Sequence, residues 1–374
     1  MKENSEKLKL RGVNYDVGSV MYFNWRPDFD PRTVTREVEI IKNDLHCNAI
    51  RITGLDIKRL LVATEIALMQ GLEVWLMPTI WNKKQDQTLS YTERVAESAE
   101  KMRREYPESL VLVVGGELTL FMQGIVEGRN VMEKVTRLMT KYKRKENQSE
   151  QVNLSKGISD LREAEHNKIL GRYLQKAVAS VRQSFQGKLT YASLLWESVD
   201  WSLFDYVSVD HYRAQRIKDQ YAEMLKPALD FGRPVVVTEF GMLTYKGAEI
   251  NGAGLDGNII DRKSRFFHYR LPLLGRLIRP KLMSGNLVRD EELQASELVD
   301  QLTILDNEGV YGAFVSTLVE QTNPYDDDPR YDLDMGSLSL VKSYSSGKRG
   351  SIYPDMTWEP KESFKSVADY LAKH

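Results

Sequence analysis

Short apolar segments and longer amphipathic segments alternate along this chain of 374 residues. Residues 110–116 (LVLVVGG) and 234–238 (PVVVT) are apolar or β-branched almost throughout, as expected of strands buried in a parallel sheet. Residues 31–45 instead repeat an apolar side chain every three or four positions, as one face of an amphipathic helix does. The alternation of these two kinds of segment predicts an α/β fold.

The same pattern predicts eight strands with helices between them. Eight strands that each precede a helix are most simply closed into a (β/α)8 barrel, the TIM-barrel fold. We expect strands at 10–16, 48–54, 73–79, 110–117, 189–196, 206–212, 234–239 and 310–317, and helices at 31–45, 56–71, 90–105, within 125–185, at 216–231 and at 362–372.

The chain contains no linker-like tract rich in proline, glycine or serine, and no repeat of 20 to 50 residues. We therefore expect a single (β/α)8 barrel domain over residues 1–374. Two long excursions interrupt the pattern, at about 242–291 after the seventh strand and 318–361 after the eighth. Loops of that length inside a compact domain are usually functional, and these two should cover the catalytic face of the barrel.

Composition excludes several classes of function. The 52 basic and 53 acidic residues balance to a net charge of −1, so neither a nucleic acid nor a membrane surface is expected as the main partner. A single cysteine and five dispersed histidines argue against a disulfide or a metal centre, and we expect no cofactor. The first residues lack the apolar core of a signal peptide, which favours a cytoplasmic location.

Polar residues with catalytic potential follow several of the predicted strands. Arg51 lies on the second strand, Glu117 ends the fourth, His211 and Tyr212 end the sixth, and Glu239 ends the seventh. Any one of them could simply face solvent or cap a helix. Because carboxyl-terminal strand ends meet at one mouth of a barrel, the whole set instead predicts an active site there.

Three short motifs resemble clan A of the glycoside hydrolases, which are retaining enzymes built on (β/α)8 barrels. They are IRI at 50–52, DHY at 210–212 and TEFG at 238–241. The resemblance implies a carbohydrate substrate, with Glu239 as the nucleophile and Glu117 as the acid/base. It also implies that Arg51, His211 and Tyr212 order Glu239 and keep it ionised.

Two positions depart from the clan pattern. Gly116 stands where the clan has an asparagine that bonds the sugar 2-hydroxyl, and Ser316-Thr317 stands where it commonly has a tryptophan. Hydrogen bonds to the 2-hydroxyl strengthen in the transition state. Gly116 therefore implies that another residue makes this contact, that the substrate differs at C2, or that activity is weak.

Aromatic side chains at the same mouth are candidate platforms for sugar rings, although tryptophans at strand ends equally often pack the rim. Glu197, next to one of them, is either a ligand for sugar hydroxyls or a rival acid. The aromatic candidates are Trp25, Trp81, Trp196 and Trp201 in loops between strands and helices, and Tyr245 and Trp358 in the two long loops.

Residues 117–124, 244–248 and 328–334 also resemble bacterial barrels that carry the label of abortive-infection proteins, a label that implies phage defence. The sequence thus predicts a retaining glycoside hydrolase that cleaves β-linked glycosides. Two alternatives remain open: a barrel that binds carbohydrate without efficient hydrolysis, and a defence protein whose long loops bind a partner.

Overall fold

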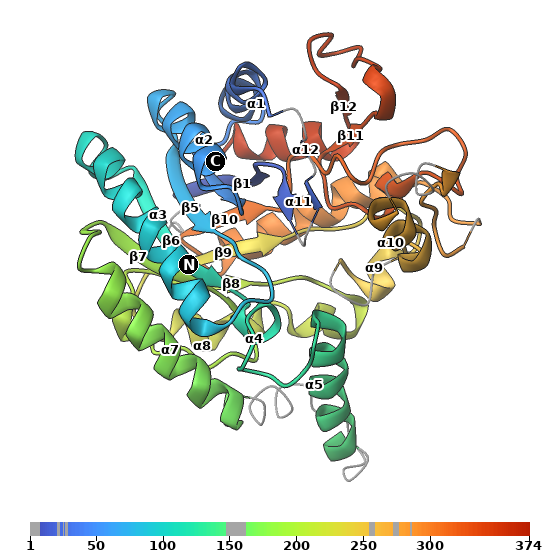
Figure 1. Ribbon diagram of the computed structural model, residues 1–374. Coiled ribbons are helices and arrows are strands. Elements are labelled where there is room, and N and C mark those ends of the chain that lie inside the picture. The colour runs from blue at the N-terminus through green and yellow to red at the C-terminus, as the bar shows by residue number, and fades with distance from the viewer. Residues whose placement is uncertain are drawn as a thin grey trace, which may run out of the picture.

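The computed structural model describes residues 8–20, 23–24, 26, 29–146, 162–253, 259–271, 277–284 and 286–374. Its central element is a closed barrel of eight parallel strands, which confirms the fold class predicted from the sequence (Figure 1). The order around the barrel is β1-β10-β9-β8-β7-β6-β5-β4, and β4 pairs with β1 to close it. The strands are β1 (Leu10–Asp16), β4 (Ala49–Gly54), β5 (Glu73–Pro78), β6 (Leu110–Gly116), β7 (Lys188–Leu194), β8 (Val207–Asp210), β9 (Val235–Phe240) and β10 (Gly312–Val315).

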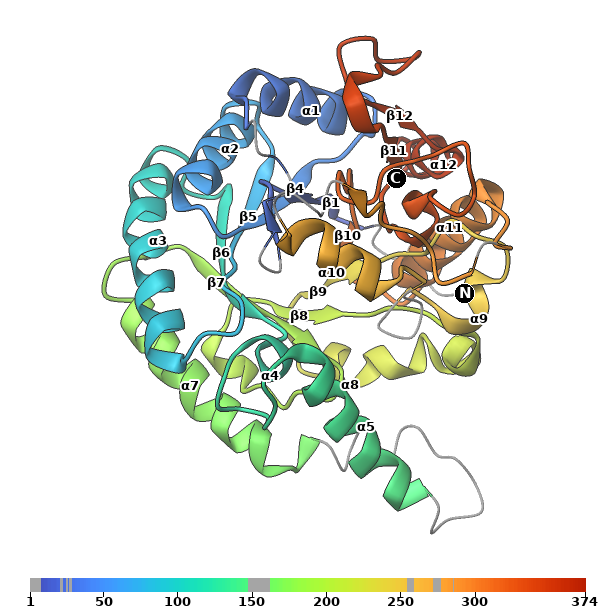
Figure 2. The same ribbon diagram turned by 45° about the vertical axis from the view of Figure 1, so that its right-hand side comes forward.

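Helices pack around the outside of the barrel. Figure 2 shows α1, α2, α3, α7 and α11 as a ring around the strands. Among the described residues, no helix is long and apolar enough to cross a membrane. The helices are α1 (Pro31–Asn43), α2 (Ile57–Met69), α3 (Gln85–Glu105), α4 (Leu118–Phe121), α5 (Val131–Glu146), α7 (Glu165–Val181), α8 (Lys226–Leu229), α9 (Ala248–Asn251), α10 (Arg262–Arg270), α11 (Glu291–Asn307) and α12 (Glu362–Leu371).

Two connections differ from the expected alternation. The segment predicted as a helix at 216–231 is mostly 3₁₀, with η2 (Gln215–Gln220) and η3 (Glu223–Leu225) before the single turn of α8. The link from β7 to β8 contains only the 3₁₀ turn η1 (Trp201–Leu203). Segments this short cannot show a clear helical period in sequence. The remaining short elements are β2 (Ser19–Val20), β3 (Phe23–Asn24), η6 (Leu333–Gly336), β11 (Val341–Ser343), η7 (Ser345–Gly347) and β12 (Trp358–Pro360).

Local chemistry explains where the predicted helices begin and end. The Asp56 carboxylate caps α2 by accepting a hydrogen bond from the backbone N–H of Arg59. Gly71 ends the same helix with φ of 80°, a left-handed conformation that glycine adopts without strain. Pro31 opens α1 behind the cap Asp30, where its missing N–H removes no helical hydrogen bond.

The core has two parts separated by the sheet. Alternate strand residues point outward and pack under the helices in one large apolar cluster. The others fill the barrel itself, where Trp75 lies 5.2 Å from Phe314 between ring centroids. Gly12 is needed beside this ring, because a Cβ there would lie 2.2 Å from the Phe314 side chain. The packed interior closes the lower barrel and leaves the polar groups at its other end.

The two long loops predicted from the sequence follow β9 and β10. In Figure 2, helix α10 from the first loop lies in front of the strands. Buried ion pairs join the two loops: Arg289 donates to Asp332 at 3.0 and 2.9 Å and to Asp334 at 2.8 Å. Lys361 contacts the same Asp334 carboxylate at 2.8 Å, and both side chains are fully buried. The loops are therefore held together over the barrel end by a charge network.

We expect Arg289→Leu to lower the free energy of unfolding by about 3–5 kcal/mol, because it leaves the buried Asp332 carboxylate without a cation and Asp334 with Lys361 alone. Urea denaturation monitored by circular dichroism measures this loss. Arg330→Leu is the matched control: it removes an arginine–aspartate pair of the same region whose partners Arg330 and Asp328 lie at the surface. Equal effects of the two changes would show that the network does not stabilise the loops.

Candidate active site

Glu239 lies at the carboxyl end of β9 with each of its oxygens held by one donor. Arg51 Nη1 donates to Oε1 at 2.7 Å, and the Tyr212 hydroxyl donates to Oε2 at 2.8 Å. Arg51 comes from β4, which β1 and β10 separate from β9, and Tyr212 follows β8, the neighbour of β9 on its other edge. The barrel thus fixes the orientation of this carboxylate from two directions.

Arg51 itself is held inside the barrel. The same Nη1 also donates to Asn14 Oδ1 at 2.8 Å, and Asn14 Nδ2 donates to the Thr238 carbonyl at 3.0 Å and to Ser316 Oγ at 3.1 Å. Burial lowers the pKa of the Arg51 guanidinium, but Glu239 and Asp210 raise it, and the net direction is upward. Arg51 is therefore a permanent positive charge next to Glu239.

Glu117 immediately follows β6 in a left-handed conformation, with φ of 49°, at the start of α4. A buried network holds this turn. Glu197 Oε1 accepts from the Thr119 backbone N–H at 3.0 Å and from its hydroxyl at 2.7 Å, while Oε2 accepts from Tyr191 OH at 2.9 Å. Tyr191 OH in turn accepts from the Leu118 N–H at 2.8 Å. Glu197 thereby positions Glu117.

The expectation that Glu197 is a sugar ligand or a rival acid is therefore wrong. Its oxygens already accept these bonds and a further one from the Leu194 N–H at 3.0 Å, and the residue is only 4% exposed. The hydrogen bonds that saturate this carboxylate come from backbone and hydroxyl groups close in space, which the sequence does not show.

Three carboxyl groups converge at the barrel mouth. One oxygen each of Glu117, Asp210 and Glu239 lies within 4.8 Å of the others. Burial raises the pKa of Glu117 well above its ordinary value, and the nearby Asp210 and Glu239 raise it further. Arg51 lowers the pKa of Glu117, but this effect is too small to reverse the upward shift. Two glutamates thus occupy different environments: Glu239 is bonded to a guanidinium, and the pKa of Glu117 is raised.

A close contact explains the departure at Gly116. A Cβ at this position would lie 2.8 Å from Met77 Cε and 3.2 Å from the Ala192 Cβ. Met77 Sδ also contacts Arg51 Nη2. The thioether of Met77 therefore occupies the space next to residue 116, and an asparagine could enter only if Met77 moved.

His211 does not take the role expected for it. Its Nε2 donates to the Tyr221 carbonyl at 2.8 Å, and its ring stacks on the Tyr221 ring at 4.0 Å. Burial lowers its pKa to about 4, so the imidazole is neutral at pH 7. Tyr212, the next residue, points to Glu239 instead, because successive side chains of an extended chain face opposite sides.

The aromatic candidates divide into two groups. Tyr245 is 5% exposed and Trp358 is 1% exposed, so neither ring offers a face to a sugar, and those expectations are wrong. The Trp358 Nε1 donates to Glu37 under α1 at 3.0 Å. Trp81, Trp196 and Trp201 are partly exposed and remain candidates, whereas Trp25 lies outside the described residues. Trp81 meets Phe121 of α4 edge-on, at 4.0 Å between centroids.

Sequence reasoning misses three residues of the mouth. Asn14 and Ser316 order Arg51 and Tyr212 from β1 and from the residue after β10. Asp210 belongs to the DHY motif, but the motif alone assigns it no function. A signal for Asp210 is present in the sequence, since it ends a buried strand as Glu117 and Glu239 do.

Groups that bind metals are not restricted to histidine and cysteine. Within the described part of the chain, Glu117, Asp210 and Glu239 form the one group of such residues with suitable spacing. Oxygen ligands of this kind favour hard cations such as Ca²⁺. Arg51 already supplies a positive charge to Glu239, and this pairing favours an organic substrate over an ion at that carboxylate.

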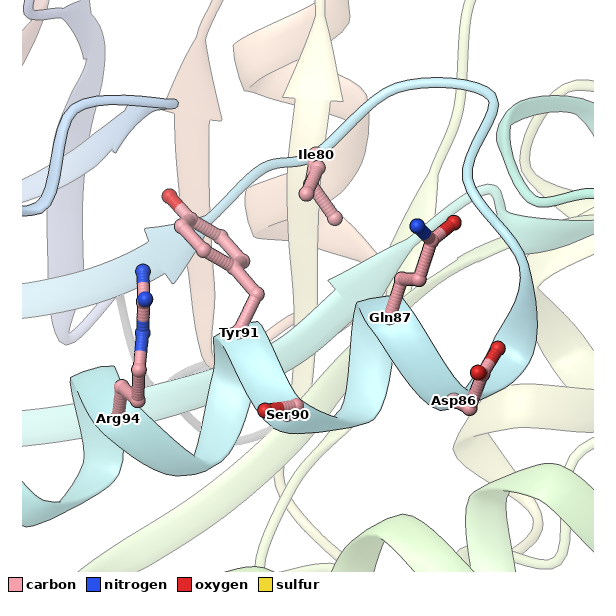
Figure 3. Close-up of a pocket in the computed structure, with 6 residues that line it drawn as sticks. All are labelled: Ile80, Asp86, Gln87, Ser90, Tyr91 and Arg94. Carbon is pink, nitrogen blue, oxygen red and sulfur yellow. The ribbon is translucent and has the colours of Figure 1, made fainter.

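A separate cavity of about 350 Å³ lies along α3, as Figure 3 shows. Side chains of α3 and Ile80 line it, and it includes none of the three carboxylates. Tyr91 points toward the β4 end and donates to the Leu55 carbonyl at 2.7 Å. The candidate chemistry therefore lies at the barrel mouth and not in this cavity.

No protein-family model matches the chain, and no curated protein matches it. Solved structures do. A GH113 β-1,4-mannanase aligns with a TM-score of 0.56 at 12% identity, over 98% of this chain and 100% of its own. A GH113 β-mannanase from Alicyclobacillus acidocaldarius, in complex with ManMIm, aligns with a TM-score of 0.53 at 13% identity, over 99% of both chains.

The chain has the fold of these glycoside hydrolases. The resemblance predicted from the sequence is thus confirmed for the fold. At this level of identity the likeness does not extend to activity or substrate, because one barrel fold carries many chemistries. The abortive-infection resemblance stays a prediction.

The buried neutral His211 makes stability depend on pH. Between pH 6.5 and 4 the unfolded chain binds a proton that the folded protein does not, so the free energy of unfolding falls as pH falls. We expect this group to contribute about 3 kcal/mol to that decrease. Urea titrations across the range should show a shallower decrease for His211→Gln. His46→Asn, at an exposed left-handed position, should keep the wild-type profile; parallel profiles for all three proteins would contradict this role.

Proposed function

We propose that the protein is a retaining glycoside hydrolase that cleaves β-linked glycosides, with Glu239 as nucleophile and Glu117 as acid/base. One observation carries the proposal. Two glutamates at the mouth of a barrel lie with oxygens within 4.8 Å, and only Glu239 is bonded to a guanidinium. Environments that push two carboxyl groups toward different protonation states are typical of an acid and a nucleophile.

In the first step, Glu239 Oε attacks the anomeric carbon and forms a glycosyl ester, while Glu117 transfers its proton to the departing oxygen. Arg51 and Tyr212 orient Glu239 for this attack, as their hydrogen bonds indicate. The desolvation and nearby carboxylates that raise the pKa of Glu117 keep its proton in place until transfer.

In the second step, Glu117 acts as base and removes a proton from water, which attacks the anomeric carbon and releases Glu239. The change of role has a physical cause. Once Glu239 is esterified it no longer carries negative charge, so one of the groups that raise the pKa of Glu117 is removed. Glu117 thereby becomes a better base when a base is required.

The carboxyl separation favours retention of configuration. Retaining enzymes place the two groups about 5–5.5 Å apart, whereas inverting enzymes leave about 6.5–9.5 Å for a water molecule. Oxygens of Glu117 and Glu239 that lie within 4.8 Å of each other agree better with the shorter of these separations. Trp81 and Trp196, partly exposed beside the mouth, are the proposed platforms for sugar rings.

Gly116 favours one second candidate, a barrel that binds carbohydrate with little hydrolysis. Met77 fills the space beside this residue, so the amide contact implied by the clan resemblance would require Met77 to move. Loss of a bond that strengthens in the transition state would lower turnover more than binding. Sugars that protect the fold against heat without being hydrolysed would support this candidate.

We expect Glu239→Ala and Glu117→Ala to lose activity in distinguishable ways. The assay uses aryl β-glycosides and β-1,4-linked manno-oligosaccharides. Glu239→Ala should lose nearly all turnover, and added azide should give the α-glycosyl azide, because azide then attacks from the face that Glu239 occupied. Glu117→Ala should lose roughly 10²–10⁴-fold, and azide should give the β-glycosyl azide by attack on the glycosyl-enzyme.

Proton NMR assigns the anomer of each azide and of the initial wild-type product. The control is Glu73→Gln, a glutamate at the opposite end of the barrel that accepts a hydrogen bond from Trp75. It should retain wild-type turnover. Full activity in either alanine variant would refute the assignment, and a wild-type product of inverted configuration would refute the retaining mechanism.

A further inference from the structure

Asp210 is the third carboxyl group of the mouth, and the two-step reaction does not use it. It ends β8 and is 4% exposed. Its Oδ1 accepts a hydrogen bond from the Thr238 hydroxyl at 2.7 Å, which fixes the side chain. Its Oδ2 is buried with no hydrogen-bond partner among the described residues. A buried carboxylate oxygen without a donor is unfavourable, so Asp210 is suited to a donor supplied by a ligand.

Among the described residues, no cation bonds to Asp210, and Arg51 acts on it only through space. Arg51 Nη1 is bonded to Glu239 and Asn14, and Nη2 contacts the sulfur of Met77. In the part of the chain that the structure describes, three carboxyl groups thus share one guanidinium. Burial and Glu239 therefore disfavour the ionised form of Asp210 and raise its pKa, because Arg51 compensates its negative charge only in part. A neutral hydroxyl could donate to Asp210 but could not compensate that charge, whereas an ammonium group does both.

The position of Asp210 restricts which sugar atom it can contact. The anomeric carbon must lie between Glu117 and Glu239, and an Asp210 oxygen lies within 4.8 Å of an oxygen of each. The partner of Asp210 therefore belongs to an atom next to the anomeric carbon. The ring oxygen on one side is an acceptor and cannot donate to a carboxylate. The glycosidic oxygen carries no hydrogen and cannot donate either, so the substituent at C2 is the donor nearest to the anomeric carbon.

The surroundings of Gly116 agree with this placement. The clan resemblance assigns residue 116 to the 2-hydroxyl, yet here it is glycine beside Met77 and Ala192. That side of the site offers a thioether and a methyl group and no amide. A polar partner for the C2 substituent must then come from another strand, and Asp210 of β8 lies at the mouth with an available acceptor.

We propose that the site takes glycosides of 2-amino-2-deoxy sugars, with the ammonium group at C2 bound by Asp210 Oδ2. This inference rests on the proposed function, whose substrate class it names. Asp210 is then a residue that determines specificity and not an acid or base of the reaction. Burial and the Glu239 charge raise the pKa of Asp210 in the empty site. A bound ammonium group would lower this pKa and favour the ionised form of Asp210.

The test compares aryl β-glycosides that differ only at C2, in gluco and in manno configuration, at pH 6. The three members of each set carry an amino, a hydroxyl or an acetamido group. We expect kcat/KM to be about 10- to 100-fold higher for the amine, the range of a charge-assisted hydrogen bond. In Asp210→Asn, which keeps the shape and the acceptor for Thr238, the ratio of amine to hydroxyl should fall to near one. Asp86→Asn, at an exposed position of α3, should keep the wild-type ratio.

The outcomes separate this inference from the proposed function. If the hydroxyl glycosides are turned over as fast as the amines or faster, the inference is wrong, but the hydrolase proposal is unaffected. If wild type hydrolyses no glycoside, the hydrolase proposal fails, and calorimetry then compares the binding of glucosamine with that of glucose. Tighter binding of glucosamine, lost in Asp210→Asn, would support the inference; equal binding would overturn it. If Asp210→Asn does not fold, the wild-type preference decides. Thermal stabilisation by Ca²⁺ that needs Asp210, without an amine preference, would indicate a metal site and overturn the inference.

Discussion

The ion pair between Arg51 and Glu239 organises the mouth of this barrel. A buried guanidinium is unfavourable unless its charge and its donors are satisfied, and here a carboxylate, an amide and a carbonyl surround it. These partners come from β1 and β9, while Arg51 itself lies on β4, and only a closed barrel brings the three strands together. Because the pair joins β4 to β9 across β1 and β10, barrel closure and the orientation of Glu239 depend on each other.

The pair also explains why the two glutamates differ. Arg51 donates a hydrogen bond to the Glu239 carboxylate. Glu197 instead holds the backbone of the turn that begins at Glu117, and this contact brings no cation to the Glu117 carboxyl group. Burial affects Arg51 and Glu117 differently. Arg51 stays charged because carboxylates lie close to it, whereas desolvation raises the pKa of Glu117. A difference in neighbours, and not in residue type, thus gives Glu239 a guanidinium partner and raises the pKa of Glu117.

Much of the fold can be predicted because its signals are local. The fourth strand is predicted at 110–117 and lies at Leu110–Gly116, because its apolar run is long and is buried throughout. Asp56 and Gly71 mark the ends of α2 because caps act within one turn. The prediction fails at 216–231, where 3₁₀ turns replace most of the helix, because the conformation of segments so short depends on tertiary packing and not on periodicity.

For the site, the sequence by itself determined which polar residues end the strands: the strand pattern alone places Arg51, Glu117, Tyr212 and Glu239 at one mouth. Only the tertiary structure decided which of them touch. It turned His211 toward Tyr221, saturated Glu197 with hydrogen bonds and left Asp210 Oδ2 without a partner among the described residues. The reason is physical. Strand alternation fixes the side of the sheet a side chain faces, but hydrogen bonds act over about 3 Å, and such distances between remote strands exist only once the barrel has closed.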